Sequence, residues 1–183
     1  MTMQRWNIDP SHSAVQFTVR HLLISKVRGT FARWQGTIDF DPNQPEASKV
    51  SVQIEAASID THEPNRDQHL KSADFFDVEN YPAITFVSRK VERRGKDRYR
   101  VLGDLTMHGV TRAVELDAEY LGAGKDLGGQ QRVGFFAKAA LNRKEFGLNW
   151  NQLLESGGVV VSEQVELSLD VQAVEAKAVE RAA

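Results

Sequence analysis

The densest group of chemically active side chains lies in residues 58–82, which read SIDTHEPNRDQHLKSADFFDVENYP. Thr61, His62, Arg66, Asp67 and His69 fall within nine positions of one another. A carboxylate close to an imidazole can act as an acid/base pair, so Asp67 and His69 define one hypothesis, an enzyme acting on a small substrate. No obvious nucleophile or oxyanion site accompanies the pair. We therefore expect a non-catalytic protein and keep the enzyme as the alternative.

The same segment raises the question of a metal site. His62 and His69 are seven residues apart, with Glu63 and Asp67 nearby. This spacing matches no zinc signature, and the chain has no cysteine to supply a thiolate ligand or nucleophile. We expect neither a metal nor a cofactor.

Strands on either side must position this segment, because period-two alternation dominates the chain. Alternation predicts strands at residues 15–19, 28–40, 50–54, 84–91, 98–105, 114–120, 132–142 and 165–173. The pattern predicts an all-β protein of about eight strands. An irregular excursion as long as 58–82 is uncommon in a compact domain and usually carries function.

Short connections indicate how the strands pair. Residues 93–97 and 107–109 have hairpin length, so their flanking strands should be antiparallel, whereas residues 122–129 read as a glycine-rich loop. Eight antiparallel strands form either a closed barrel or two packed sheets. The long predicted strands favour an eight-stranded antiparallel barrel, with one or two short helices in its long loops.

An eight-stranded barrel is either filled by its own side chains or leaves room for one small ligand. The predicted inward face carries large apolar residues and also small ones, namely Gly103, Ala118, Ala137 and Ala139. Close packing is the default of protein interiors, so composition alone favours a filled barrel. A space left beside the small residues would be apolar and would suit a long hydrocarbon chain.

A second irregular segment, residues 142–158, places Arg143 and Lys144 beside Phe146 and Trp150. It reads either as an apolar plug in one barrel end or as a lid whose basic residues face a ligand head group. Residue types alone do not separate the two.

Length and charge narrow the number of domains and the classes of partner. A chain of 183 residues fits one domain, which we place at residues 5–175, followed by a tail at 176–183. A net charge of −2 with interspersed signs argues against nucleic acid, and no stretch reaches a membrane span. The opening residues lack a secretion signal, so we expect a cytoplasmic protein, or a periplasmic one if the sequence is a processed form.

Seven motifs in a fixed order resemble the YceI-like family across nearly the whole chain, from Trp6 to about Val174. They are W-x-I-D-x-x-H-S-x-V-x-F-x-V-x-H-L from Trp6, G-x-F-x-x-W-x-G from Gly29, S-I-D-T from Ser58, R-D-x-H-L-K-S-x-D-F-F-D from Arg66, Y-P-x-I-x-F from Tyr81, G-x-L-T-M-H-G-V-T-R from Gly103 and N-R-K-E-F-G-L-x-W from Asn142. The resemblance implies a lipocalin-like barrel that binds, transports or stores an apolar amphiphile without catalysis. Polyisoprenoids such as octaprenyl pyrophosphate, isoprenoid quinones and fatty acids or amides are the implied ligands. The resemblance also implies frequent homodimers. We expect no stable membrane insertion, because no stretch of the chain is apolar over the length of a membrane span.

Carried onto this chain, the resemblance predicts three sets of ligand-binding residues. The channel would be lined by Phe17, Val19, Ile54, Phe86, Phe135 and Leu141. One end would be closed by Phe75, Phe76, Phe146 and Trp150. Arg66 and Arg143, with His69, would meet a polar head group. Arg66 could instead be ion-paired with Asp67 or Asp74, and a purely structural, filled barrel stays open as a third hypothesis.

Overall fold

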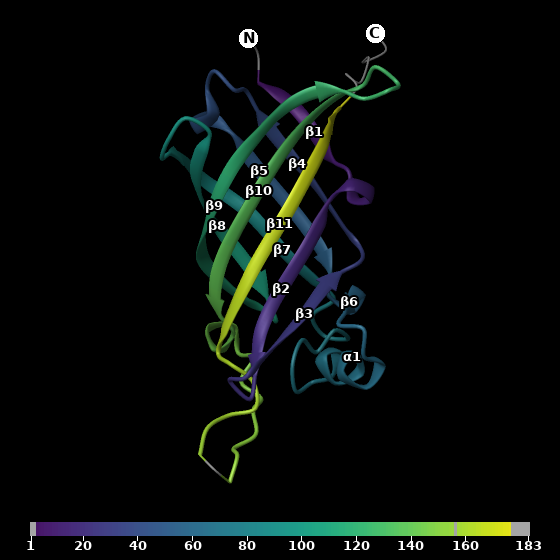
Figure 1. Ribbon diagram of the computed structural model, residues 1–183, viewed down its shortest axis with the longest axis vertical. Helices are drawn as coiled ribbons and strands as arrows, with labels where there is room; N and C mark the ends of the chain where they lie inside the picture. Colours follow the sequence, from purple (N-terminus) through teal and green to yellow (C-terminus); the bar gives the residue numbers. More distant parts are fainter. Residues whose placement is uncertain (1–2, 156, 177–183) are drawn as a thin grey trace.

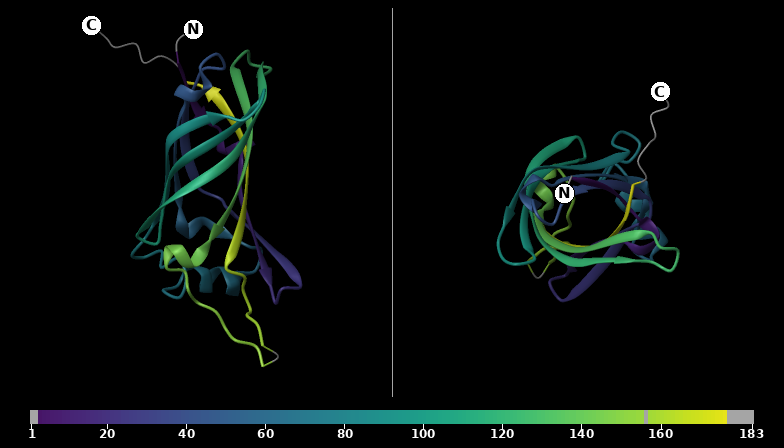
Figure 2. Two further views of the ribbon diagram at one scale, coloured as in Figure 1. Left: turned by 90° about the vertical axis from the view of Figure 1, so that its left-hand side faces the viewer. Right: turned by 90° about the horizontal axis from the view of Figure 1, so that it is seen from above.

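The computed structural model describes residues 3–155 and 157–176 and shows a barrel of antiparallel strands (Figures 1 and 2). The predicted tail at 176–183 lies outside the described residues except for Ala176. The described strands are β1 (Gln4–Ile8), β2 (Ala14–His21), β3 (Ser25–Phe31), β4 (Trp34–Phe40), β5 (Lys49–Glu55), β6 (Ile59–Asp60), β7 (Ala83–Arg93), β8 (Arg98–Met107), β9 (Val110–Lys125), β10 (Gln131–Asn142) and β11 (Gln164–Glu175). Helix α1 spans Pro64–Lys71, and short 3-10 turns span η1 (Pro10–His12), η2 (Pro45–Ala47), η3 (Ala56–Ser58) and η4 (Arg143–Phe146).

These strands occupy eight positions around a closed ring, which confirms the predicted eight-stranded antiparallel barrel. The sheet order is β1-β4-β5-β7-β8-β9-β10-β11, and β11 pairs back to β1. Strand β2 also pairs with β11, so β1 and β2 share one position, interrupted by η1. Strands β3 and β4 share the next position, and the short β6 continues the position of β5 by pairing with β3.

The predicted single strand at residues 28–40 is wrong, because the chain breaks between β3 and β4. At the break Ala32 N donates to Ser58 O (3.0 Å), and Arg33 O accepts from Glu55 N (3.0 Å). These bonds keep the backbone satisfied through the bend, so the apolar alternation continues across it and hides it in the sequence. The chain thus pairs with β2 before the bend, as β3, and with β1 after it, as β4, and it stays in the barrel wall throughout.

One strand that was not predicted and one loop of different length also distinguish the structure from the prediction. Strand β1 was missed, although its buried Trp6 and Ile8 alternate with exposed neighbours. It is only five residues long, and Pro10 follows closely. The predicted loop at 122–129 is shorter than expected, because β9 continues through Gly122 and Gly124 to Lys125. The predicted hairpin at 107–109 is confirmed: His108 and Gly109 both have positive φ (52° and 71°), as a two-residue turn requires.

The barrel has two differently built ends. At the end near the termini, the rings of Phe40, Tyr120 and Phe135 form an aromatic wall with centroids 5.1 to 5.5 Å apart. At the opposite end lie α1 and the long connection between β10 and β11 (Figure 1). The segments singled out in the sequence, 58–82 and 142–158, therefore meet at one barrel end.

Arg132 braces the outer surface near the wall, and this bracing predicts a pH-dependent stability. Its guanidinium donates to Asp9, Asp126 and Gln172, each at 2.8 Å. Hydrogen bonds from Ser11, Arg132 and His12 hold the pKa of the Asp9 carboxyl far below its ordinary value of 3.8. A carboxyl with a lowered folded pKa stabilises the fold above its unfolded pKa, and loses that contribution as pH falls toward the folded pKa.

We expect Asp9→Asn to lower the free energy of unfolding by about 1 to 2 kcal/mol at neutral pH, because charge-assisted hydrogen bonds are lost. The gap between the variant and the unmodified protein should shrink as the pH falls below the ordinary value of 3.8. Urea unfolding at several pH values measures it, with exposed Asp170→Asn as control. A gap that stays constant down to about pH 2 would contradict the assignment.

Candidate functional site

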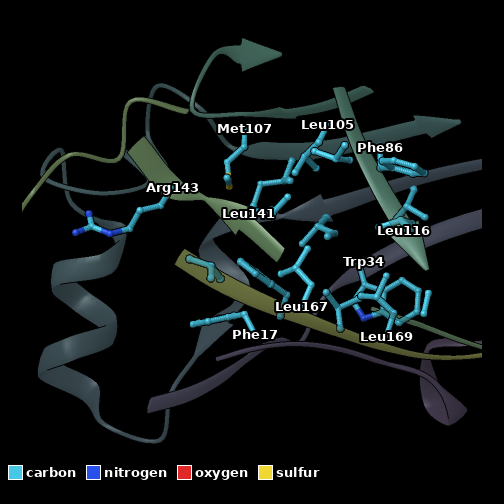
Figure 3. Close-up of a pocket in the computed structure, with 18 of the residues that line it drawn as sticks. Phe17, Trp34, Phe86, Leu105, Met107, Leu116, Leu141, Arg143, Leu167 and Leu169 are labelled. Atoms are coloured by element: carbon cyan, nitrogen blue, oxygen red, sulfur yellow. The ribbon is translucent and has the colours of Figure 1, made fainter. Parts of the chain in front are cut away.

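A cavity of about 770 Å³ runs inside the barrel, which is within the range of small-molecule binding sites. Figure 3 shows Phe86, Leu105, Leu167 and Leu169 directed toward a common space. Alternation explains the lining: along β8 every second residue, Tyr99, Val101, Leu105 and Met107 among them, is buried. A purely structural barrel would require a filled lumen. Within the residues that the structure describes, the lumen is open.

Twelve of the thirteen predicted ligand-binding residues line this cavity. They are Phe17, Val19, Ile54, Arg66, His69, Phe75, Phe76, Phe86, Phe135, Leu141, Arg143 and Trp150. Phe146 does not line it. Its side chain is fully buried in the core, and its carbonyl contacts His108 Nδ1 at 3.1 Å, so it anchors η4 against the β8–β9 turn.

The small residues explain only part of the open space. Ala118 and Ala137 line the cavity, as expected. Gly103 does not, because the Phe86 ring lies over it: a Cβ atom there would be 2.5 Å from Phe86 Cζ. Ala139 packs against the core cluster. Neighbouring aromatic rings thus fill one part of the lumen and leave another open.

Sequence reasoning missed much of the lining. The apolar face of β11 borders the cavity, and so do several residues of β2, β4, β5 and β9 whose alternation gave the available signal. The main ones are Val15, Ile38, Phe40, Val50, Val52, Val114, Val165, Leu167, Leu169 and Val171. The polar rim residues Arg20, His21, Ser25 and Asn65 were also missed, and nothing in their local sequence marks them.

Polar lining is concentrated at the end that holds α1. It comes from the β2–β3 hairpin, from the α1 segment and from η4. The residues are Arg20, His21, Ser25, Thr61, Asn65, Arg66, His69 and Arg143. Apart from Ser48, which precedes β5, the cavity therefore offers a long apolar interior and one polar end, which is the arrangement that an amphiphile needs.

Arg66 is positioned by Thr61. Glu63 caps α1 by accepting from Asn65 N and Arg66 N, and Pro64 occupies the first turn. The Arg66 guanidinium donates to Thr61 Oγ1 (2.7 Å) and to Thr61 O (2.9 Å). The ion pair considered as an alternative is replaced by this contact. Arg66 keeps further N–H donors and borders the cavity, so it can also reach a head group.

Asp67 and His69 do not form the acid/base pair of the enzyme hypothesis. Asp67 Oδ1 accepts from Thr61 N (2.9 Å) and from Thr61 Oγ1 (2.6 Å). His69 Nε2 contacts Asp74 Oδ2 at 2.8 Å. His62 is 3.6 Å from Asp60 and is largely exposed, so the two histidines of the metal hypothesis face different partners.

His69 belongs to an aromatic cluster that joins the two long connections. Its ring packs edge-on against Phe75 (5.1 Å) and Trp150 (4.6 Å), and Phe75 and Trp150 are 5.3 Å apart. Phe76 packs edge-on against Phe31 of the barrel wall (5.9 Å). We call the group of His69, Phe75, Phe76 and Trp150 the gate, because all four line the α1 end of the cavity.

Arg143 is buried and holds the β10–β11 connection together. Its Nε donates to Ser162 O (2.9 Å), Nη1 to Leu148 O (2.6 Å) and Trp150 O (2.9 Å), and Nη2 to Val161 O (3.3 Å). Burial lowers the pKa of this guanidinium. In Figure 3 it extends away from the apolar side chains. The predicted head-group residue is thus committed to backbone carbonyls.

Comparison with solved structures places this barrel among known ones. A YceI protein from Campylobacter jejuni superposes with a TM-score of 0.75 at 33% identity, covering 86% of this chain and 90% of that one. BcnA from Burkholderia cenocepacia superposes with a TM-score of 0.79 at 22% identity, covering 90% and 98%. A polyisoprenoid binding domain from Saccharophagus degradans gives 0.69 at 15% identity, covering 96% and 100%. The latter two show the shared fold.

Sequence comparison agrees. A protein of the UPF0312 group from Staphylococcus epidermidis is 37% identical over 171 residues, covering 93% of this chain and 97% of its own length. One from Pseudomonas putida is 40% identical over 169 residues, covering 92% and 84%. The family model described as the YceI-like domain matches residues 6–173. The chain therefore belongs to the YceI-like family.

Proposed function

We propose that this protein binds a long-chain apolar amphiphile in its barrel and carries or stores it without catalysis. The observation that carries the proposal is the cavity of about 770 Å³, whose lining is aliphatic and aromatic except for Ser48 and the polar residues at the α1 end. Each Å² of apolar ligand surface buried there contributes roughly 25 cal/mol. A flexible hydrocarbon chain fits such an interior, and its polar head would lie beside Arg66 and Asn65.

The proposed ligand class is an isoprenoid chain, a quinone or a fatty acid or amide. This class is supported by the described lining, which is apolar along most of the channel. A hydrocarbon chain there would be held mainly by apolar contact area. The Saccharophagus degradans domain with this fold is described as polyisoprenoid binding, which fits the proposal.

The test is to purify the protein under native conditions, extract it with organic solvent and identify the extract by mass spectrometry. The proposal expects an apolar chain in near-stoichiometric amount. Protein that is empty and also takes up neither prenyl nor acyl fluorescent probes would refute it.

The gate predicts how the ligand is retained. We expect the double variant Phe75→Ala/Phe76→Ala to release a bound probe about tenfold faster, because both rings cover the cavity and Phe75 also supports Trp150. His69→Ala should change the release rate less, since it removes a smaller ring. Stopped-flow dilution of a fluorescent acyl probe measures the rate.

The matched control is Phe136→Ala, which removes a ring from the outer face of β10, between two residues that line the cavity. Its release rate should equal that of the unmodified protein. If His69→Ala has the largest effect of the three changes, the gate has been assigned wrongly.

A further inference from the structure

Two turns project side by side beyond the barrel at the α1 end (Figure 2, left). One joins β2 to β3, and the other belongs to the β10–β11 connection. Leu22 N donates to Val160 O (2.9 Å), Ser162 N donates to Arg20 O (3.0 Å), and His21 and Val161 form a β-bridge. The two turns therefore form one continuous rim.

This rim is apolar at its tip and lies next to the polar end of the cavity. Leu23, Ile24 and Leu153 are 61%, 82% and 82% exposed. Val160 and Val161, which pair with the β2–β3 turn, line the cavity. We call Leu22, Leu23, Ile24 and Leu153 the apolar tip. The exposed side chains of Leu23, Ile24 and Leu153 contribute little to the core.

The backbone at the tip favours other residues. Leu22 and Leu23 both have positive φ (53° and 59°), and Ile24 N donates to His21 O (3.1 Å). This is the geometry of a type I′ turn, which strongly prefers Asn-Gly and in which leucine is strained. Leu22 is half-buried, but Leu23 is held in this geometry and exposed to solvent, which points to a task outside the fold.

The two strands that flank the β2–β3 turn carry one sign of charge, whereas the β10–β11 connection and β11 carry the exposed carboxylates Glu155, Glu163 and Glu166. Residues 14–31 contain Arg20, Lys26 and Arg28 and no carboxylate. Arg20 lies opposite Lys26 in the β2–β3 register, with Arg28 one pair farther along the same face. All three are exposed, and among the described residues none is ion-paired with a carboxylate. An apolar tip backed by unpaired cations complements the surface of a bilayer that contains anionic lipids.

We propose that the apolar tip docks on the surface of an anionic lipid bilayer, with Arg20, Lys26 and Arg28 at the head groups. Docking in this orientation brings the polar end of the cavity to the membrane surface, where an amphiphile can enter or leave. The inference goes beyond the proposed ligand binding. Attachment to vesicles is measured separately from cavity content, so either proposal can fail without the other.

The experiment is co-sedimentation with vesicles of phosphatidylcholine alone, and of equal parts phosphatidylcholine and phosphatidylglycerol. We expect binding to the mixed vesicles and at least tenfold weaker binding to phosphatidylcholine. Leu23→Ser/Ile24→Ser should weaken binding to the mixed vesicles at least tenfold. Lys26→Gln/Arg28→Gln should weaken it roughly tenfold, and added salt should act in the same direction.

The matched control is Leu121→Ser/Leu127→Ser, which removes two leucines exposed by 61% and 110% at the other barrel end. It should leave vesicle binding unchanged. A second variant, Leu22→Asn/Leu23→Gly, gives the turn its preferred residues. We expect it to raise the thermal unfolding midpoint while weakening vesicle binding, which separates docking from damage to the fold.

Three results would overturn the proposal. The first is unmodified protein that sediments with neither vesicle, and the second is a control variant that loses as much binding as Leu23→Ser/Ile24→Ser. The third is a dimer in solution that dissociates in Leu23→Ser/Ile24→Ser, which would make the apolar tip an interface between two copies of the chain. Protein that carries no ligand but still sediments with mixed vesicles would overturn the ligand-binding proposal alone.

Discussion

Replacing Ala118 by tryptophan should abolish ligand binding, with at least a tenfold loss of bound lipid and of probe affinity. Ala118 borders the cavity opposite Ala137, and neither methyl group fills the lumen. An indole at this position occupies the space that a hydrocarbon chain would take, so ligand contact area is lost along the channel. Lipid content by mass spectrometry and probe titration measure the effect.

Ala113→Trp is the matched control, because Ala113 lies on the same strand with an exposed side chain on the outer face. It should bind ligand like the unmodified protein. Circular dichroism and thermal unfolding establish that both variants fold. A folded Ala118→Trp protein that keeps its full lipid content would show that the ligand lies elsewhere.

Replacing Arg143 by methionine should give the largest loss of stability, about 3 to 5 kcal/mol in the free energy of unfolding. The guanidinium donates to four backbone carbonyls and is 4% exposed. Each bond from a charged donor contributes roughly 1.5 to 3 kcal/mol, and we discount the sum because water can reach some of the freed carbonyls. The thermal midpoint should fall by roughly 10 °C.

The neighbouring Lys144 supplies the control. Its Nζ lies 2.7 Å from Glu163 in an exposed pair, so Lys144→Met should cost at most about 1 kcal/mol. Arg143→Lys should recover only part of the loss, because an ammonium cannot match the planar fork of donors. Equal unfolding midpoints for Arg143→Met and Lys144→Met would contradict the role assigned to Arg143.

The barrel was predictable from sequence because each strand has one wet and one dry face. That signal is strong in β8, where burial alternates from Tyr99 to Met107. It fails at Ala32 and Arg33, since a bend with satisfied hydrogen bonds leaves the alternation intact. It also fails for β1, which is too short to establish a period.

The candidate site was predictable where its residues follow from the same alternation of inward and outward positions. Inward positions such as Phe17 and Leu141 line the cavity for this reason. Residue type could not tell that the Phe86 ring would cover Gly103 while Ala118 stayed open, because this depends on ring orientation in three dimensions. Nor could it tell that Arg143 would bind carbonyls, since a guanidinium serves carbonyls and ligand head groups equally well.

The aromatic wall of Phe40, Tyr120 and Phe135 lies at one end of the barrel, and the polar lining residues lie at the other, where the proposed head group would sit. Between these two points the lining offers contact area without distinguishing one methylene from the next. For the proposed ligand we therefore expect selection by molecular length: shorter chains would leave part of the channel empty, and longer ones would have to fold back or protrude through the gate. The expected cargo is then a homologous series whose upper limit is set by the length of the channel.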